Sequence, residues 1–213
     1  MPTKTTVNAS HGPGAVARRH LVLASTSRYR RTLLERLRVS FVAVAPDTDE
    51  AALSGETPAA TAWRLAEAKA RSVAHAHPGS LIIGSDQVAD CEGRAVGKPG
   101  NHERAVAQLT ELSGKTVIFH TGLALLDTAA GTCQTALVDV RSTFRFLTAA
   151  EIEAYLRQER PYDCTGSVRS EALGIALFES IESDDPTALI GLPLIRLTSM
   201  LRAAGFPIVG NST

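Results

Sequence analysis

Two stretches in the middle of the chain give the plainest β-strand signal, and this signal constrains the fold more than any other feature. They span residues 116–126 and 135–147, joined by an 8-residue connection that contains Gly131. In the second stretch the apolar positions are Val138, Val140, Phe144 and Phe146. A period of two is typical of strands with one buried face and one solvated face. We therefore expect an antiparallel hairpin with these four side chains in the core.

Short apolar runs followed by helical patterns precede this hairpin. Leu21–Ala24 has the pattern of a buried strand, and the hydroxyls of Ser25–Ser27 can cap the helix that follows. A second helix begins at Thr57–Pro58, with a predicted buried stripe of Trp63, Ala66, Ala70 and Val73. Further expected elements are strands at 41–45 and 81–84, a hairpin at 92–93, helices at 101–112 and 149–158, and a helical segment from 185 to 205 with a break at 191–193. Parallel strand–helix units together with a long hairpin predict a mixed, twisted α/β sheet with flanking helices.

The first 19 residues differ from the rest of the chain. They hold three basic residues and no acid, and they show no hydrophobic period. We expect a flexible N-terminal extension over residues 1–19, a single domain over 20–206 and a C-terminal tail over 207–213. A transit peptide is the alternative for the extension, but serines are few and no amphipathic stripe is present.

The overall charge is balanced, with 22 Lys and Arg against 22 Asp and Glu among 213 residues. Such a chain has no bulk field for capturing nucleic acid or an anionic membrane, and its aromatic content of 5% gives few stacking platforms for bases. No apolar run approaches the roughly 18 residues that span a bilayer, so we expect a cytoplasmic protein. Cys91, Cys133 and Cys164 form no CxxC pair, which favours reduced thiols.

The turn from the first strand into the first helix is one candidate site. Ser25–Arg31 combines hydroxyls, free N–H groups of a helix N-terminus and several guanidinium groups. These are the parts of a polyphosphate cradle. The alternative is a capped helix with surface arginines.

Carboxylates form the second candidate site. Asp47, Asp49 and Glu50 follow the second expected strand, and Asp86 follows the third. Hard oxygen ligands of this kind hold Mg²⁺ or Mn²⁺ and orient water for attack on a phosphate, although turn and cap residues are often acidic too. Lys69 and Lys98 would add point charges for phosphate oxygens.

An ordered series of motifs resembles the Maf family of nucleotide pyrophosphatases from about Leu21 to Gly205. The segments are Leu21–Ser27, Arg30–Arg31, Asp49–Glu50, Glu67–Lys69, Gly84–Gln87 and Gly97–Pro99, with Ser113–Gly114, Thr121–Gly122 and Gly166–Ser167. The resemblance implies an elongated, two-lobed Maf/ITPase-like fold with a central cleft. One departure is Arg28, which stands where the family commonly has Pro.

Within this family the chain is most similar to the 7-methyl-GTP pyrophosphatase branch, because Ser85–Gln87 stands where the dTTP/UTP branch typically has Ala-Asp-Thr. Glu171–Ile175 and Asp185–Pro193 point the same way. The implied roles are Asp86 as proton acceptor with Lys69 and Lys98; Tyr29, Gln87 and Glu171 for base specificity; Ser25, Arg30 and Arg31 for phosphate; and Glu50 with Asp86 for Mg²⁺ or Mn²⁺.

The resemblance therefore predicts hydrolysis of 7-methyl-GTP to 7-methyl-GMP and pyrophosphate, which removes modified nucleotides from the pool. A dTTP/UTP pyrophosphatase of the same family is the alternative enzyme. A non-catalytic nucleotide-binding regulator linked to cell division is the alternative from another class. The resemblance also suggests a homodimer, and we expect neither nucleic acid nor a membrane as a partner.

Overall fold

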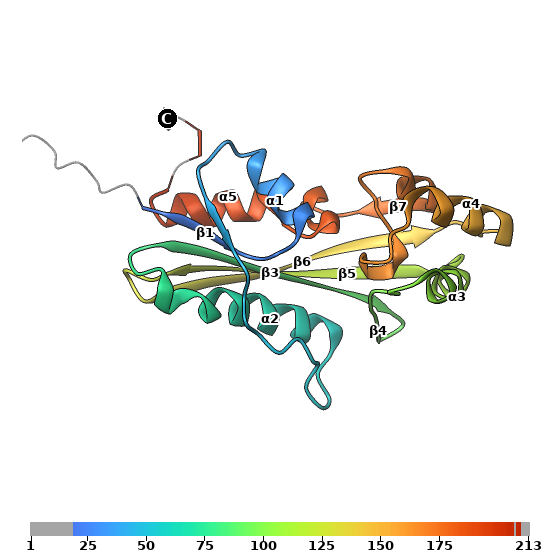
Figure 1. Cartoon of the computed structure of the whole chain (residues 1–213), viewed down its shortest axis with the longest axis horizontal. Coiled ribbons are helices and arrows are strands. Elements are labelled where there is room, and N and C mark those ends of the chain that lie inside the picture. The colour runs from blue at the N-terminus through green and yellow to red at the C-terminus, as the bar shows by residue number, and fades with distance from the viewer. Residues whose placement is uncertain (1–18, 207, 210–213) are drawn as a thin grey trace, which may run out of the picture.

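A computed structural model describes residues 19–206 and 208–209. The rest of the expected extension and most of the expected tail lie outside these residues. Within the described residues, seven strands form one mixed sheet in the order β2-β1-β3-β5-β6-β7, and β4 pairs with β3 (Figure 1). The strands are β1 (Leu21–Ala24), β2 (Val42–Val44), β3 (Leu81–Cys91), β4 (Arg94–Val96), β5 (Thr116–Asp127), β6 (Thr132–Phe144) and β7 (Phe178–Glu182).

Within residues 19–206, five α-helices and four short 3-10 helices flank this sheet. The α-helices are α1 (Arg28–Glu35), α2 (Pro58–Ser72), α3 (His102–Leu112), α4 (Ala149–Glu159) and α5 (Leu194–Ala203). The 3-10 helices are η1 (Ala74–Ala76), η2 (Thr165–Ser167), η3 (Leu173–Leu177) and η4 (Pro186–Ile190). β1 pairs in parallel with β2 and β3, whereas β3, β5, β6 and β7 pair antiparallel. The mixed sheet that the sequence predicts is confirmed.

The hydrophobic core divides between the two ends of the long strands, which gives the molecule two lobes. In the first lobe, α1 and α5 cover one face of the sheet and α2 covers the other. In the second lobe, α3 and α4 contribute to one cluster with β3, β5 and β6. The three long strands run through both lobes (Figure 1). The elongated, two-lobed arrangement follows from these strands.

Helix α2 lies directly on the sheet backbone because two glycines leave room for it. A Cβ added to Gly84 would lie 2.0 Å from the carbonyl oxygen of Ala66, and one added to Gly122 would lie 2.1 Å from that of Ala62. Only small side chains fit at this contact. Trp63, expected in the buried stripe, is instead 41% exposed, while Ala66 is buried as expected.

Two further expectations about strands were wrong. β3 continues past Gly84 because it pairs with β5 as far as Asp90, so Asp86 lies within the strand rather than after it. Phe146 is 89% exposed, because β6 ends at Phe144 after a shift in its register with β7.

The edge of β3 opposite β5 is interrupted in the middle, and this interruption positions the site. β1 covers residues 81–84 of that edge, and β4 covers residues 89–91. The strand residues between them, 85–88, therefore have no strand partner on this side among the residues that the structure describes. They include Asp86 and Gln87, which leaves both residues beside a gap between the two lobes.

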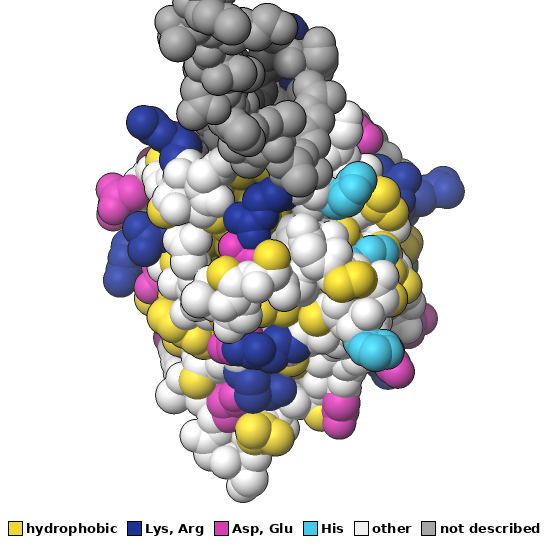
Figure 2. All heavy atoms as spheres, turned by 90° about the vertical axis from the view of Figure 1, so that its left-hand side faces the viewer, with side chains coloured by type: hydrophobic (Ala, Val, Ile, Leu, Met, Phe, Trp, Pro, Cys, Tyr) yellow, Lys and Arg dark blue, Asp and Glu magenta, His cyan; other side chains and the backbone are white. Residues whose placement is uncertain are grey.

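Acidic and basic side chains are interspersed on the face shown in Figure 2, so this end of the molecule presents both signs of charge. Near the start of the described chain, Arg19 forms an ion pair with Asp127, and its guanidinium also donates to the carbonyl oxygen of Ala204 at 3.1 Å. These contacts attach the start of the described chain to the first lobe.

Gly84→Ala tests the close packing of α2. The new methyl group would overlap the backbone of Ala66, so we expect a loss of about 2 kcal/mol of unfolding free energy. In a domain of this size such a loss lowers Tm by about 4–8 °C in a thermal melt. Gly97→Ala is the matched control, since its added Cβ meets nothing within 4 Å. Equal melting temperatures for the two variants would refute the packing argument.

Candidate active site

A cleft of about 720 Å³ opens at the interrupted edge of β3, between the two lobes. Its first-lobe wall is the turn from β1 into α1, with Glu50 and Lys69. Its second-lobe wall includes residues 95–98, 163–165 and Glu171. Of the residues to which the family resemblance gives a role, all but Arg31 line it: Ser25, Tyr29, Arg30, Glu50, Lys69, Asp86, Gln87, Lys98 and Glu171.

At the centre of the cleft, Lys69 forms ion pairs with two carboxylates. The Nζ atom of Lys69, on α2, lies 2.6 Å from Oδ1 of Asp86 and 2.6 Å from Oε1 of Glu50. Lys69 and Asp86 are 5% and 8% exposed, whereas the Glu50 side chain is 60% exposed. The hydrogen bond from Lys69 lowers the pKa of Glu50, even though partial burial opposes this shift. Lys69 thus brings two carboxylates from separate segments to one point.

The β1–α1 turn supplies hydroxyls and one half-buried guanidinium. The Ser27 hydroxyl caps α1 by accepting from the N–H of Arg30 at 3.4 Å, and the Ser25 hydroxyl accepts from the N–H of Ser27 at 3.1 Å. Nε of Arg30 donates to the carbonyl oxygen of Gly191 at 2.8 Å. Burial lowers the pKa of Arg30, and the charges of Asp86 and Glu50 oppose that shift. An arginine stays protonated in such a site, so it contributes a fixed positive charge.

Arg31 and Lys98 differ in their relation to the cleft. Arg31 is exposed and does not line it, because the next position along α1 points away from the side that Arg30 occupies. Lys98 follows β4 and is exposed at the cleft, and its charge contributes to the lowered pKa of Glu50. Asp47 and Asp49 are exposed and do not line the cleft either.

The amide N–H groups of Gln87 form hydrogen bonds within the protein. Nε2 of Gln87 lies within hydrogen-bond distance of three oxygens: the carbonyls of Ala188 at 2.8 Å and Leu189 at 3.0 Å, and the Thr121 hydroxyl at 3.1 Å. Its donors therefore tie β3 to η4. Only the carbonyl oxygen of the amide is left to contact a ligand.

Tyr29 lies at the rim of the cleft against cationic groups. Its hydroxyl accepts from Nη2 of Arg28 at 2.6 Å and lies 3.4 Å from Sγ of Cys164. The guanidinium carbons of Arg28 and Arg169 lie 4.7 and 5.8 Å from the ring centroid. Burial, as the largest cause, raises the pKa of Tyr29 to about 12, so its phenol is neutral at ordinary pH.

Glu171 faces Arg169 across the same rim. Its Oε1 lies 3.6 Å from Nε of Arg169, and the Glu171 side chain is 24% exposed. Arg169 is in turn held by Glu159 at 2.9 Å. The Arg169 Nε atom is buried and has no hydrogen-bond partner in the described part of the chain. Arg169, which sequence reasoning missed, therefore connects two of the expected specificity residues, Tyr29 and Glu171.

The donor set suits a divalent cation that is shared with phosphate. Glu50 and Asp86 place two carboxylates on the Lys69 ammonium, and Mg²⁺ is commonly bound by one or two carboxylates together with substrate phosphates. Among the described residues no group of three or more His, Cys, Asp or Glu could hold a metal alone. The charged residues lining the cleft also balance, with Arg28, Arg30, Lys69 and Lys98 against Glu50, Asp86, Asp163 and Glu171. A triphosphate bound there would need further positive charge.

Comparison with known proteins identifies a family and several similar relatives. A family model described as Maf-like protein matches residues 20–204. A protein named 7-methyl-GTP pyrophosphatase from Albidiferax ferrireducens is 57% identical over 192 residues, which cover 90% of this chain and 96% of that relative. A protein of the same name from Burkholderia thailandensis is 59% identical over 191 residues, covering 88% and 89%. One from Cupriavidus metallidurans is 56% identical over 190 residues, covering 89% and 96%.

Helices of the described chain are too short or too polar to cross a membrane.

The thiol of Cys164 gives a test of the electrostatics at the rim. Burial raises its pKa to about 11, so at pH 8 its thiolate fraction is roughly 100-fold smaller than that of an ordinary cysteine. We expect slow alkylation by iodoacetamide at pH 8, with a rate that rises as the pH approaches 11. Mass spectrometry of the labelled peptide measures it, and free cysteine is the reference. Alkylation at the rate of free cysteine at pH 8 would contradict this environment.

Proposed function

The chain belongs to the Maf family, and on that basis we propose that it is a nucleoside triphosphate pyrophosphatase that hydrolyses 7-methyl-GTP to 7-methyl-GMP and pyrophosphate. The proposal rests on relatives of that name that are 56–59% identical over about nine-tenths of the chain. The observation in the structure that carries it is the Lys69 ion pair with Asp86 and Glu50 in a cleft large enough for a nucleotide. The activity would remove modified nucleotides from the pool.

Asp86 is suited to accept a proton from the attacking water. Lys69 holds Oδ1 of this carboxylate at 2.6 Å, which fixes its orientation. The water oxygen bonds to the α-phosphorus while the bond from that phosphorus to the bridging oxygen breaks. The proton goes to Asp86, and pyrophosphate leaves.

The remaining basic residues would act on charge. Arg30 and Lys98 lie on opposite walls of the cleft, where they can neutralise phosphate oxygens as negative charge redistributes in the transition state. Glu50 and Asp86 would hold Mg²⁺ or Mn²⁺, which when bound supplies the positive charge that the balanced cleft lacks. Arg31, away from the cleft, has no direct role in this scheme.

Base selection would depend on the rim. The positively charged base of 7-methyl-GTP would be attracted to an aromatic face at Tyr29 and to the carboxylate of Glu171. Arg28 and Arg169 already lie near the Tyr29 ring, so stacking of the base requires one of them to move. Gln87 would contribute its amide oxygen, since its donors are used within the protein.

The same proposal includes a cellular location and an oligomeric state. The protein would act in the cytoplasm, where its nucleotide substrate is found, and it would form a homodimer. Both follow from the sequence and the family resemblance.

Pyrophosphate release tests the function directly. Purified protein with Mg²⁺ or Mn²⁺ is assayed with 7-methyl-GTP, GTP, dTTP, UTP and CTP, and we expect the highest kcat/KM for 7-methyl-GTP. Asp86→Asn keeps the shape of the side chain but removes its basicity, so turnover should fall by about 10²–10⁴ with a normal thermal melt. Near wild-type turnover by this variant would refute the role of Asp86.

The relative rates of pyrophosphate release from the five nucleotides distinguish the alternative functions. Preference for dTTP or UTP would retain the chemistry and refute the 7-methyl-GTP assignment. Tight nucleotide binding without pyrophosphate release would favour a non-catalytic regulator.

A further inference from the structure

The segment that carries Glu50 is held by polar contacts. It connects β2 to α2, and residues 49–55 are all exposed, including Leu53 at 60%. Apolar packing therefore does little to fix its path. Yet Glu50 is brought within 2.6 Å of the buried Lys69, so other contacts must hold this segment.

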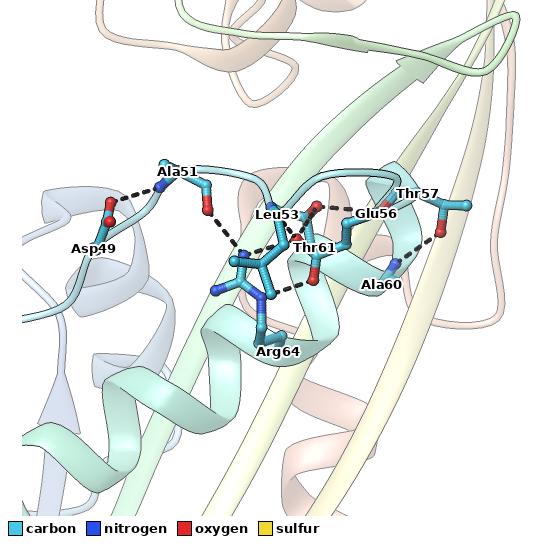
Figure 3. Close-up of polar contacts among 8 residues, drawn as sticks. All are labelled: Asp49, Ala51, Leu53, Glu56, Thr57, Ala60, Thr61 and Arg64. Atoms are coloured by element: carbon cyan, nitrogen blue, oxygen red, sulfur yellow. Dashed lines mark hydrogen bonds and ion pairs between the residues drawn. The ribbon is translucent and has the colours of Figure 1, made fainter.

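Arg64 and Glu56 form the strongest of these contacts (Figure 3). Nε of Arg64 donates to Oε1 of Glu56 at 2.7 Å, and Nη2 donates to Oε2 at 2.8 Å. This two-pronged geometry matches the guanidinium to the carboxylate and fixes both side chains. The hydrogen bonds from Arg64, as the largest cause, lower the pKa of Glu56 to about 2, so the carboxylate is ionised at working pH.

The same pair extends to the backbone next to Glu50. Nη2 of Arg64 also donates to the carbonyl oxygen of Ala51 at 3.0 Å. Oε2 of Glu56 accepts from the N–H of Leu53 at 3.0 Å and from the Thr61 hydroxyl at 3.0 Å. Both backbone contacts lie within three residues of Glu50. Figure 3 shows Arg64 extending from α2 toward this loop, with Ala51 and Leu53 gathered around it.

Arg64 and Lys69 lie on the same helix, so α2 holds the loop at one point and receives Glu50 at another. Arg64 itself does not line the cleft. Any effect that it has on the reaction must pass through the loop. An exposed loop without these bonds would sample many conformations, most of which place Glu50 away from Lys69.

We propose that the Arg64–Glu56 pair is a clamp that positions Glu50 in the active site, which makes Arg64 a positioning residue of the reaction. The inference rests on the proposed function for its catalytic consequence. Its structural part, that the clamp orders the loop, holds for any activity of this cleft.

The test combines amide hydrogen exchange with turnover. Arg64→Met removes the donors and keeps an apolar stem. We expect exchange at the Leu53 amide to accelerate by at least tenfold, because its acceptor Glu56 is released. We also expect kcat/KM for pyrophosphate release to fall by about 10-fold or more, as it does when a group that orients a metal ligand is removed. The metal concentration for half-maximal turnover should rise.

Arg64→Lys and Arg71→Met are the comparison variants. Lysine keeps the charge but cannot bond both Glu56 and Ala51 with a planar fork, so intermediate effects are expected. Arg71 pairs with Glu67 on the same helix at 2.7 Å and is exposed, and it does not line the cleft. Arg71→Met should change neither exchange nor turnover.

A Glu50→Gln background separates positioning from general stability. If Arg64 acts through Glu50, Arg64→Met in this background should still accelerate exchange at Leu53 but cause no further loss of turnover. Equal losses of turnover in both backgrounds would overturn the proposal, as would unchanged exchange at Leu53. A wild-type protein that releases no pyrophosphate would refute the proposed function instead, and exchange alone would then decide whether the clamp exists.

Discussion

The buried ammonium of Lys69 between Asp86 and Glu50 is the interaction on which the rest of the site depends. Each carboxylate comes from a different segment, one from β3 and one from the loop before α2. A buried carboxylate such as Asp86 is costly without a partner. Lys69 reaches it only because α2 lies against Gly84 and Gly122, where the sheet offers no side chain to hold the helix away. Packing of the first lobe and charge in the cleft are thus linked through one helix.

The interrupted edge of β3 explains why the cleft lies where it does. β1 and β4 cover the two ends of that edge and belong to different lobes, so the uncovered middle is accessible from both. Ser25, Arg30 and Tyr29 approach from the β1–α1 turn and the start of α1, whereas Lys98 and Glu171 approach from the opposite wall. Residues far apart in the sequence therefore meet around a short stretch of strand.

Much of the fold could be predicted from the sequence, because local signals agreed with the packing. The Ser27 and Thr57 caps, the Glu92–Gly93 turn and the long hairpin lie where the pattern places them. Trp63 was misplaced because helical spacing does not reveal that glycines lie beneath the helix. Asp86 was assigned to a strand end, since polar residues in mid-strand resemble a turn until the pairing with β5 is known.

The sequence indicated which residues belong to the candidate site better than it indicated how they are arranged. The order of motifs identified nine residues that do line the cleft, but it also included Arg31, whose direction depends on how α1 packs. Sequence could not show that the donors of Gln87 are used by the scaffold, nor that Arg64 reaches the backbone beside Glu50. These facts depend on tertiary contacts between segments more than ten residues apart.

Urea unfolding of Lys69→Met, Asp86→Asn and the double variant tests the central claim most directly. Lys69→Met leaves Asp86 buried beside an apolar side chain, so we expect a loss of about 3 kcal/mol of unfolding free energy. Neutralising Asp86 as well should recover most of that loss, which would appear as strong coupling in the double-mutant cycle. Strictly additive losses, or a Lys69→Met variant as stable as the wild type, would contradict the account.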